Sequence, residues 1–271
     1  MELLCIFAAL AVLFLFCAFL TLKCNLHAAL APLSALGIAV AWLTAAGMAN
    51  LLLPGTVLLW AVFAGSGVWA LVPHKGQRPA CRRLVTPGAV LFWGMALAFA
   101  VYFFIRQPLA TKYDELSLWA TAVKVTKADN RLYALATLGT PWPQTQNPGL
   151  PLLSYFFQFL GHYADWKIYV AYDVLAAAVF AAVLGGLNFR QYRIAVPLAA
   201  ICWFAPWFLT VYNHTIYLDT TYMTAYGDVP AGLALGGAPV GEDFVQAFAD
   251  FCQVVHFVDI GRVDRRVAVI F

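Results

Sequence analysis

Two adjacent acidic residues, Asp114 and Glu115, stand at the head of a long polar interval that covers residues 106–150. A carboxylate in such a loop can act as a general base on a hydroxyl group, or hold a divalent cation beside a phosphate leaving group. Adjacent side chains on a helix point about 100° apart, so we expect only one of the two to face a site. Asp114 is the first candidate for a catalytic residue, and for a metal ligand, and Glu115 is the second.

The same two acids can instead begin a helix. Thr111 lies three residues before Asp114, which is the spacing of a capping box. Acidic side chains in a first turn interact favourably with the helix dipole by about 0.3–1 kcal/mol each. Residues 112–128 therefore predict an amphipathic helix on the membrane surface, and periodicity alone favours this interpretation of the acids. Its apolar face would be formed by Leu116, Trp119, Ala120 and Val123.

The elements around this loop have the composition of a membrane protein. Of the 271 residues, 63% are hydrophobic and 11% are charged, and the mean hydropathy is +0.79. Soluble domains carry about 25% charged residues. We therefore expect an all-α, polytopic transmembrane helical bundle of about six spans, with residues 106–150 as its one large external loop. The apolar runs that predict these spans are residues 3–22, 29–53, 56–72, 87–105, 168–187 and 194–211, and Pro54-Gly55 would form the turn between the second and the third.

Other classes of protein are not indicated. The net charge of +3 gives no sign of a nucleic-acid partner. Six cysteines are present without any C-x-x-C pair, which favours packing residues over a zinc site or a disulfide framework.

Basic residues orient the predicted spans. The densest basic cluster lies in residues 74–83, and the positive-inside rule places it in the cytoplasm. Arg190 and Arg193 mark a second inner connection. The loop at 106–150 then lies on the outer face of what we expect to be a bacterial inner membrane, although its own basic residues do not orient it.

Two segments depart from the pattern of spans. Residues 149–161 are apolar but too short to cross a bilayer, so we expect an interfacial or re-entrant segment. Residues 237–271 turn abruptly polar. We predict a transmembrane domain over 1–236 and an atypical C-terminal tail over 237–271, which would be a truncated or frame-shifted end or a small peripheral segment.

The loop also carries a resemblance to a known family. The pattern Y-D-E-L-S-L-W-A followed by Lys124, and then P-W-P-Q-T-Q-N-P-G-L-P-L-L-S-Y-F-F, resembles the bacterial GT-C-type membrane glycosyltransferases. In that group the first large external loop carries an acidic motif, and a proline-rich stretch then re-enters the membrane. The resemblance covers about residues 88–236.

This resemblance implies transfer of a sugar from a polyprenyl-phosphate donor to a lipid or cell-envelope glycan acceptor at the outer face. Asp114 would match the catalytic acid of the family, with Glu115 beside it, and Lys124 or Arg131 would face the donor phosphate. Trp119 belongs to the matching pattern. The residues leave the cofactor open; a divalent metal such as Mg²⁺ or Mn²⁺ is a candidate, and Asp114 would hold it. Membrane lipids are further expected partners.

Other polar residues are weaker candidates. Asp219 lies on the predicted outer face and would join the site, unless it belongs to a polar turn before the next span. Asp173 falls inside a predicted span, where a charge is costly. It would bind or titrate if it faces the bundle, and the interfacial alternative is favoured. His162 is expected at the membrane interface.

A non-catalytic polytopic protein, either a transporter or an assembly subunit, is the alternative class. Transporters keep polar residues inside their spans and have broken helices near the midplane. Here the polar residues collect in one external loop, which favours the transferase.

Overall fold

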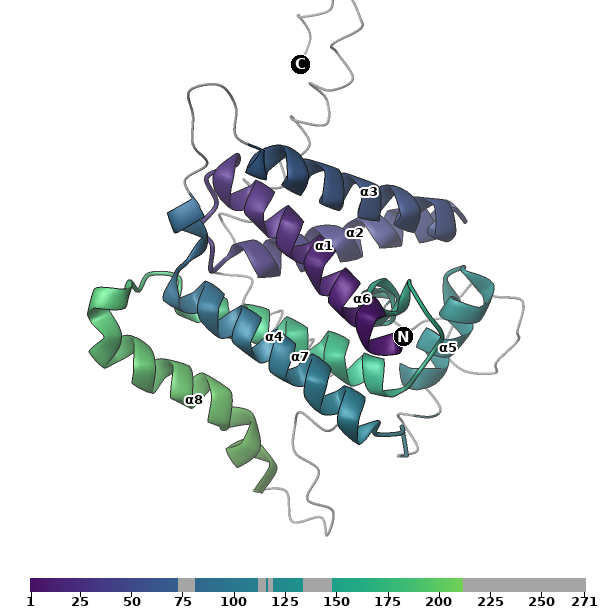
Figure 1. Ribbon diagram of the computed structural model, residues 1–271. Helices are drawn as coiled ribbons and strands as arrows, with labels where there is room; N and C mark the ends of the chain where they lie inside the picture. Colours follow the sequence, from purple (N-terminus) through teal and green to yellow (C-terminus); the bar gives the residue numbers. More distant parts are fainter. Residues whose placement is uncertain (73–80, 112–115, 117–118, 134–147, 212–271) are drawn as a thin grey trace, which may run out of the picture.

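Every regular element in the described part of the chain is a helix, as the composition predicts. The computed structural model describes residues 1–72, 81–111, 116, 119–133 and 148–211, and of 205–211 the backbone only. Short 3-10 turns η1 (Cys81–Leu84) and η4 (Phe189–Gln191) precede α4 and α8. The α-helices are α1 (Glu2–Leu22), α2 (Ala31–Met48), α3 (Leu52–Leu71), α4 (Pro87–Arg106), α5 (Ala120–Asp129), α6 (Gly149–Gln158), α7 (Trp166–Val183) and α8 (Tyr192–Val211) (Figure 1).

Five of these helices, α1, α2, α3, α4 and α7, are long and apolar enough to cross a membrane. A span needs about 20 residues because a helix rises about 1.5 Å per residue. These helices indicate an integral membrane protein, and they coincide with five of the predicted apolar runs. The sixth run, residues 194–211, lies within α8.

The turn between α2 and α3 lies earlier than the sequence suggests. The chain reverses at Asn50, whose φ of 57° is in the left-handed region, and α3 begins at Leu52. Pro54 is therefore inside the first turn of α3, where a missing N–H costs nothing. The predicted span of residues 29–53 is shortened accordingly.

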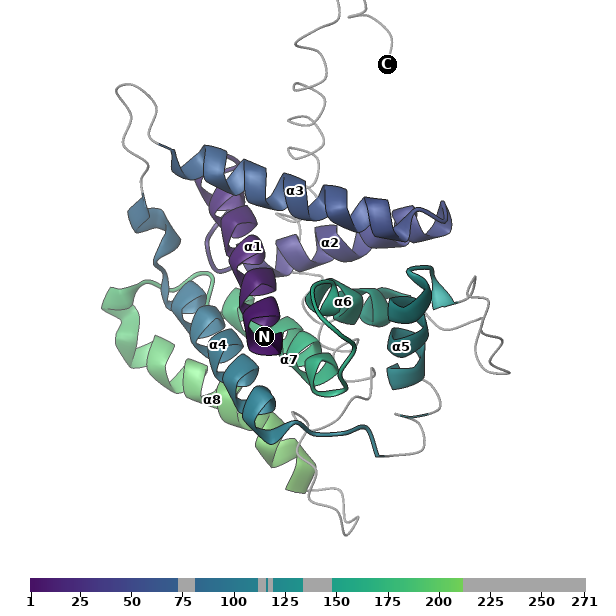
Figure 2. The same ribbon diagram turned by 45° about the vertical axis from the view of Figure 1, so that its right-hand side comes forward.

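The long helices alternate in direction, so two groups of residues collect at opposite ends of the bundle (Figures 1 and 2). We call residues 1–5, 106–111, 119–133 and 159–167 the N-terminal end. We call residues 23–27, 81–86 and 185–193 the basic end. At the basic end, Arg83 Nη1 donates to Asn25 Oδ1 at 3.0 Å, and Lys23 Nζ lies 4.7 Å from the centre of the Trp69 ring.

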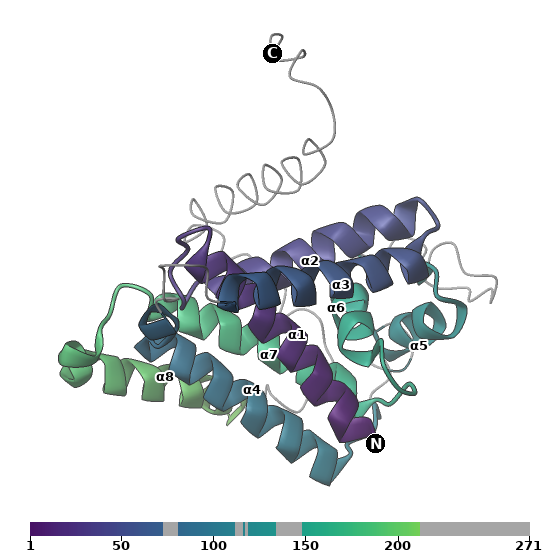
Figure 3. The same cartoon turned by 45° about the horizontal axis from the view of Figure 1, so that its top comes forward.

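Two glycines allow close crossings between long helices. A Cβ on Gly88 of α4 would come within 2.5 Å of the Ala181 carbonyl oxygen of α7. A Cβ on Gly67 of α3 would overlap the backbone of Leu15 in α1. Small residues at such contacts let helix backbones approach closely, which is how helices associate in membranes. Figure 3 shows α4 and α7 running beside each other for most of their length.

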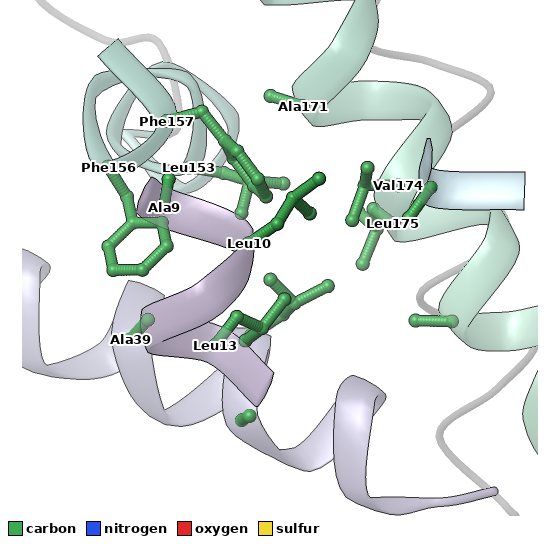
Figure 4. Packing of buried hydrophobic residues seen from close by; sticks show 14 of the residues in the cluster. Ala9, Leu10, Leu13, Ala39, Leu153, Phe156, Phe157, Ala171, Val174 and Leu175 are labelled. Atoms are coloured by element: carbon green, nitrogen blue, oxygen red, sulfur yellow. The ribbon is translucent and has the colours of Figure 1, made fainter. Parts of the chain in front are cut away.

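The short helix α6 is buried inside the bundle. All residues from Pro151 to Gln158 are buried, and α6 packs against α1, α2, α5 and α7. In Figure 4, Leu10 of α1 points between Phe157 of α6 and Val174 of α7. Helix α6 has ten residues and is too short to span a bilayer, as predicted. Burial on all sides agrees with the re-entrant alternative.

Of the helix predicted at 112–128, residues 120–128 are confirmed as helical, and residues 112–115, 117 and 118 lie outside the described residues. Helix α5 begins at Ala120 and ends at Asp129, and Asn130 follows with a positive φ of 51°. Ala120 and Val123 are buried as expected, but Leu116 is 51% exposed. Leu116 therefore does not belong to the packed face.

Candidate functional site

The structure places only some of the predicted site residues. Asp114, Glu115 and Asp219 lie outside the described residues. Lys124 and Arg131 are exposed, on α5 and just after it, and Trp119 is half-buried at the start of α5. Among the described residues these three make no hydrogen bond or ion pair with one another. Trp119, Lys124 and Arg131 all lie on or beside α5, but their side chains do not contact one another through a polar interaction.

Helix α5 is fixed to the bundle by three polar contacts. Lys127 Nζ donates to the Phe159 carbonyl oxygen at 2.7 Å, and the Tyr163 hydroxyl donates to the Ala120 carbonyl oxygen at 3.3 Å. The Tyr155 hydroxyl of α6 donates to Asn130 Oδ1 at 2.7 Å. The two ends of α5 are thus held against α6 and the connection that follows it.

The start of the polar loop is attached to the same connection. The Ala110 backbone N–H donates to Asp165 Oδ2 at 3.2 Å, and the Tyr169 hydroxyl donates to the Leu109 carbonyl oxygen at 3.3 Å. The described residues before and after the acid pair are therefore both anchored to the segment that joins α6 to α7. These anchored flanking residues form a frame at the N-terminal end.

A buried ion pair lies beneath this frame. The Lys167 side chain is 0% exposed, and its ammonium group pairs with Glu2 at the start of α1 and donates to the His162 carbonyl oxygen at 2.6 Å. A buried charge is tolerated only when it is paired and hydrogen-bonded. The pair therefore fastens α1 to the start of α7.

Gly161 makes room for this pair. Its φ is +88°, and an added Cβ would lie 2.7 Å from Glu2 Oε2 and 3.1 Å from Cys5 Sγ. Alanine at this position would be strained by about 1–2 kcal/mol from the left-handed backbone alone. We expect Gly161→Ala to lower the thermal unfolding midpoint of the purified protein in detergent. Gly186→Ala is the control, because no atom lies within 4 Å of its Cβ, and equal midpoints for both variants would contradict the assignment.

Lys127 lies in an unfavourable place for a positive charge. Burial of its side chain, together with the nearby positive charge of Lys167, lowers the pKa of Lys127 below its ordinary value of 10.5. In contrast, burial raises the pKa of the Tyr155 hydroxyl to about 12, and burial with the neighbouring Asp165 raises the pKa of Tyr163. Both phenols therefore stay protonated and act as hydrogen-bond donors.

The lowered pKa of Lys127 has a measurable consequence. Between that pKa and 10.5 the unfolded chain binds more protons at this residue than the folded chain does, so the free energy of unfolding rises with pH. We expect the thermal midpoint of the wild type to rise relative to that of Lys127→Met as the pH is raised toward 10.5. Parallel pH profiles for the two proteins would show that Lys127 does not titrate in this way.

Four buried polar atoms in α6 and α7 have no hydrogen-bond partner: Ser154 Oγ, Gln158 Nε2, the Tyr172 hydroxyl and Asp173 Oδ2. The Tyr172 hydroxyl lies near Ser154, without a hydrogen bond of normal geometry. Asp173 is 5% exposed, so its side chain faces the interior of the bundle. It stands seven positions into α7 and is enclosed by neighbouring helices.

The described residues contain no group of three histidine, cysteine or acidic side chains that could hold a metal ion. The predicted metal ligand, Asp114, lies outside them. His162 is exposed at the N-terminal end, in agreement with an interfacial position.

Comparisons with protein-family models, with curated proteins and with solved structures gave no match. The fold and the contacts described above are therefore the basis for any functional assignment.

Few features of the sequence mark the residues that organise this region. Glu2 and Lys167 stand 165 positions apart, each at the edge of an apolar run where a charge is ordinary. Lys127 lies one turn after Lys124 in α5, so the helical spacing places the two lysines on the same side of the helix. Only the packing of α5 against α6 distinguishes Lys127, whose amine turns inward, from Lys124, which is exposed.

Proposed function

We propose that this chain is a membrane glycosyltransferase that moves a sugar from a polyprenyl-phosphate donor to a lipid or cell-envelope glycan. The observation that carries the proposal is the anchoring of the polar loop. Residues on both sides of Asp114 and Glu115 are tied to the connection between α6 and α7, at one end of a bundle of apolar helices. Anchored residues on both sides of the acid pair suit a substrate whose lipid tail stays in the bilayer.

Charge distribution supports an outer location for this loop. The described basic end carries Lys23, Arg82, Arg83, Arg190 and Arg193 and contains no acidic residue. The N-terminal end mixes acidic and basic residues, including Glu2, Asp129 and Asp165. The positive-inside rule then assigns the basic end to the cytoplasm and the loop to the outer face.

In this proposal, Asp114 removes the proton from the acceptor hydroxyl as it attacks the sugar, and Glu115 has a secondary role. Lys124 and Arg131 are exposed beside the anchored helix α5, where they would neutralise the donor phosphate. Trp119 would offer an aromatic face to the sugar or to the lipid, and Asp219 would complete the polar lining. A divalent metal would polarise the phosphate leaving group if Asp114 holds one.

The proposal is tested in cells that lack the gene. Restoring the full-length wild-type protein should restore a missing sugar on a lipid-linked or envelope glycan, observed by mass spectrometry. Restoring Asp114→Asn at the same expression level should not. An unchanged glycan profile with the normally expressed variant would overturn the proposal.

A second candidate, a transporter, is favoured by one observation. Asp173 is buried inside α7 with an unpartnered carboxylate oxygen, and charged residues inside spans commonly mark ion or proton pathways. This candidate predicts proton flux into proteoliposomes loaded with a pH-sensitive dye, and loss of that flux in Asp173→Asn. Absence of flux in the wild type, with sugar transfer present, would decide for the transferase.

A further inference from the structure

The basic end has a charge pattern that the proposed reaction does not use. Its described basic residues, Lys23, Arg82, Arg83, Arg190 and Arg193, are all exposed. The acidic residues in the described part of the chain are Glu2, Asp129, Asp165 and Asp173, and all of these lie at the N-terminal end or inside α7. The positive charge of the basic end is therefore not neutralised by described protein groups.

Two of these cations are fixed by neutral partners. Arg83 donates to the amide oxygen of Asn25, and the Lys23 ammonium lies over the Trp69 ring. Neither contact removes charge. Both hold a cation in place at the level where α1 and α3 end.

The segment around η4 adds aromatic groups to the pattern. Phe189 and Tyr192 are 54% and 58% exposed, and they alternate with Arg190 and Arg193 at a spacing of three residues. The backbone here is held by a capping box: the Arg190 N–H donates to Asn188 Oδ1 and the Asn188 N–H donates to Gln191 Oε1, both at 3.0 Å. The alternation of arginines and aromatics is thus built on an ordered turn.

This arrangement fits the boundary between lipid tails and headgroups. Exposed aromatic side chains at the end of an apolar helix sit at the headgroup level, and arginines beside them reach the phosphates. The turn leads directly into α8, whose sequence is predominantly apolar.

We propose that the basic end, centred on Arg190 and Arg193, is a docking surface for the headgroups of anionic phospholipids. Charge complementarity selects an anionic headgroup, and the exposed Phe189 and Tyr192 select a lipid over a soluble phosphate. Binding of lipid at this surface does not depend on whether the opposite end of the bundle transfers sugars or moves ions.

Titration of the purified full-length protein in detergent with phosphatidylglycerol and with phosphatidylcholine, followed by native mass spectrometry, tests the proposal. Phosphatidylglycerol should bind more tightly. Arg190→Gln and Arg193→Gln should each weaken its binding about fivefold, the change expected for one charge near an anionic headgroup. Arg106→Gln removes an exposed charge from the N-terminal end and should leave this binding unchanged.

Two further measurements keep the result interpretable. In the wild type, affinity for phosphatidylglycerol should fall as salt is added, because salt screens exposed charges. Inorganic phosphate at the same concentration should not displace the lipid. Equal binding of the two lipids, an equal effect of Arg106→Gln, or displacement by inorganic phosphate would each overturn the proposal.

Discussion

Replacing Asp114 with asparagine in the full-length protein is expected to lower the rate of sugar transfer by about 10²–10⁴-fold, the usual contribution of a general base. The amide keeps the size of the side chain but cannot accept the proton of the acceptor hydroxyl. The measurement is the initial rate of product formation by purified protein in proteoliposomes, with a labelled lipid-linked sugar. The apparent affinity for the donor should change much less than the rate.

The matched control for this variant is Asp129→Asn. Asp129 is another acid of the same polar interval, at the end of α5. Its replacement should leave the rate within about threefold of the wild type, since it has no assigned role in the chemistry. Glu115→Gln should fall between the two. If Asp114→Asn is as active as Asp129→Asn, the acid pair only begins a helix.

Replacing Lys167 with methionine should lower the free energy of unfolding by about 2–4 kcal/mol. The substitution keeps most of the apolar stem but leaves Glu2 without its cation and the His162 carbonyl without its donor. The cost lies below that of a fully buried charge because the Glu2 side chain is 30% exposed. Thermal or denaturant unfolding in detergent measures it.

A double-mutant cycle separates the ion pair from the packing around it. Glu2→Gln should cost more than Lys167→Met, since it leaves the fully buried ammonium without its counter-ion. The double variant Glu2→Gln/Lys167→Met should cost less than the two single variants together. Additive losses would show that Glu2 and Lys167 do not stabilise the protein as a pair.

The spans could be predicted because lipid imposes a simple rule. Every backbone N–H and C=O in a bilayer must be bonded internally, so a long apolar run can only be a helix. Residues 3–22 and 87–105 illustrate this, since α1 and α4 match them almost residue for residue. Pro54 does not mark the turn between α2 and α3, because proline occurs both in turns and in the first turn of a helix.

The packing of the site could not be predicted in the same way. Nothing in the local pattern of residues 149–161 distinguishes a helix at the interface from one enclosed by four others, since both are short and apolar. Lys167 follows Trp166 at the edge of an apolar run, a common arrangement at a membrane surface, yet its ammonium is buried against Glu2. Contacts between residues so far apart in the chain leave no periodic signal.

The most direct test of the proposed function compares two classes of sugar donor. Purified full-length protein in proteoliposomes receives a labelled sugar carried either by a polyprenyl phosphate or by a nucleotide, together with a membrane extract that supplies acceptors. We expect transfer of label from the polyprenyl-phosphate donor alone. Transfer from the nucleotide sugar, or retention of all label on the polyprenyl-phosphate donor, would contradict the proposed function.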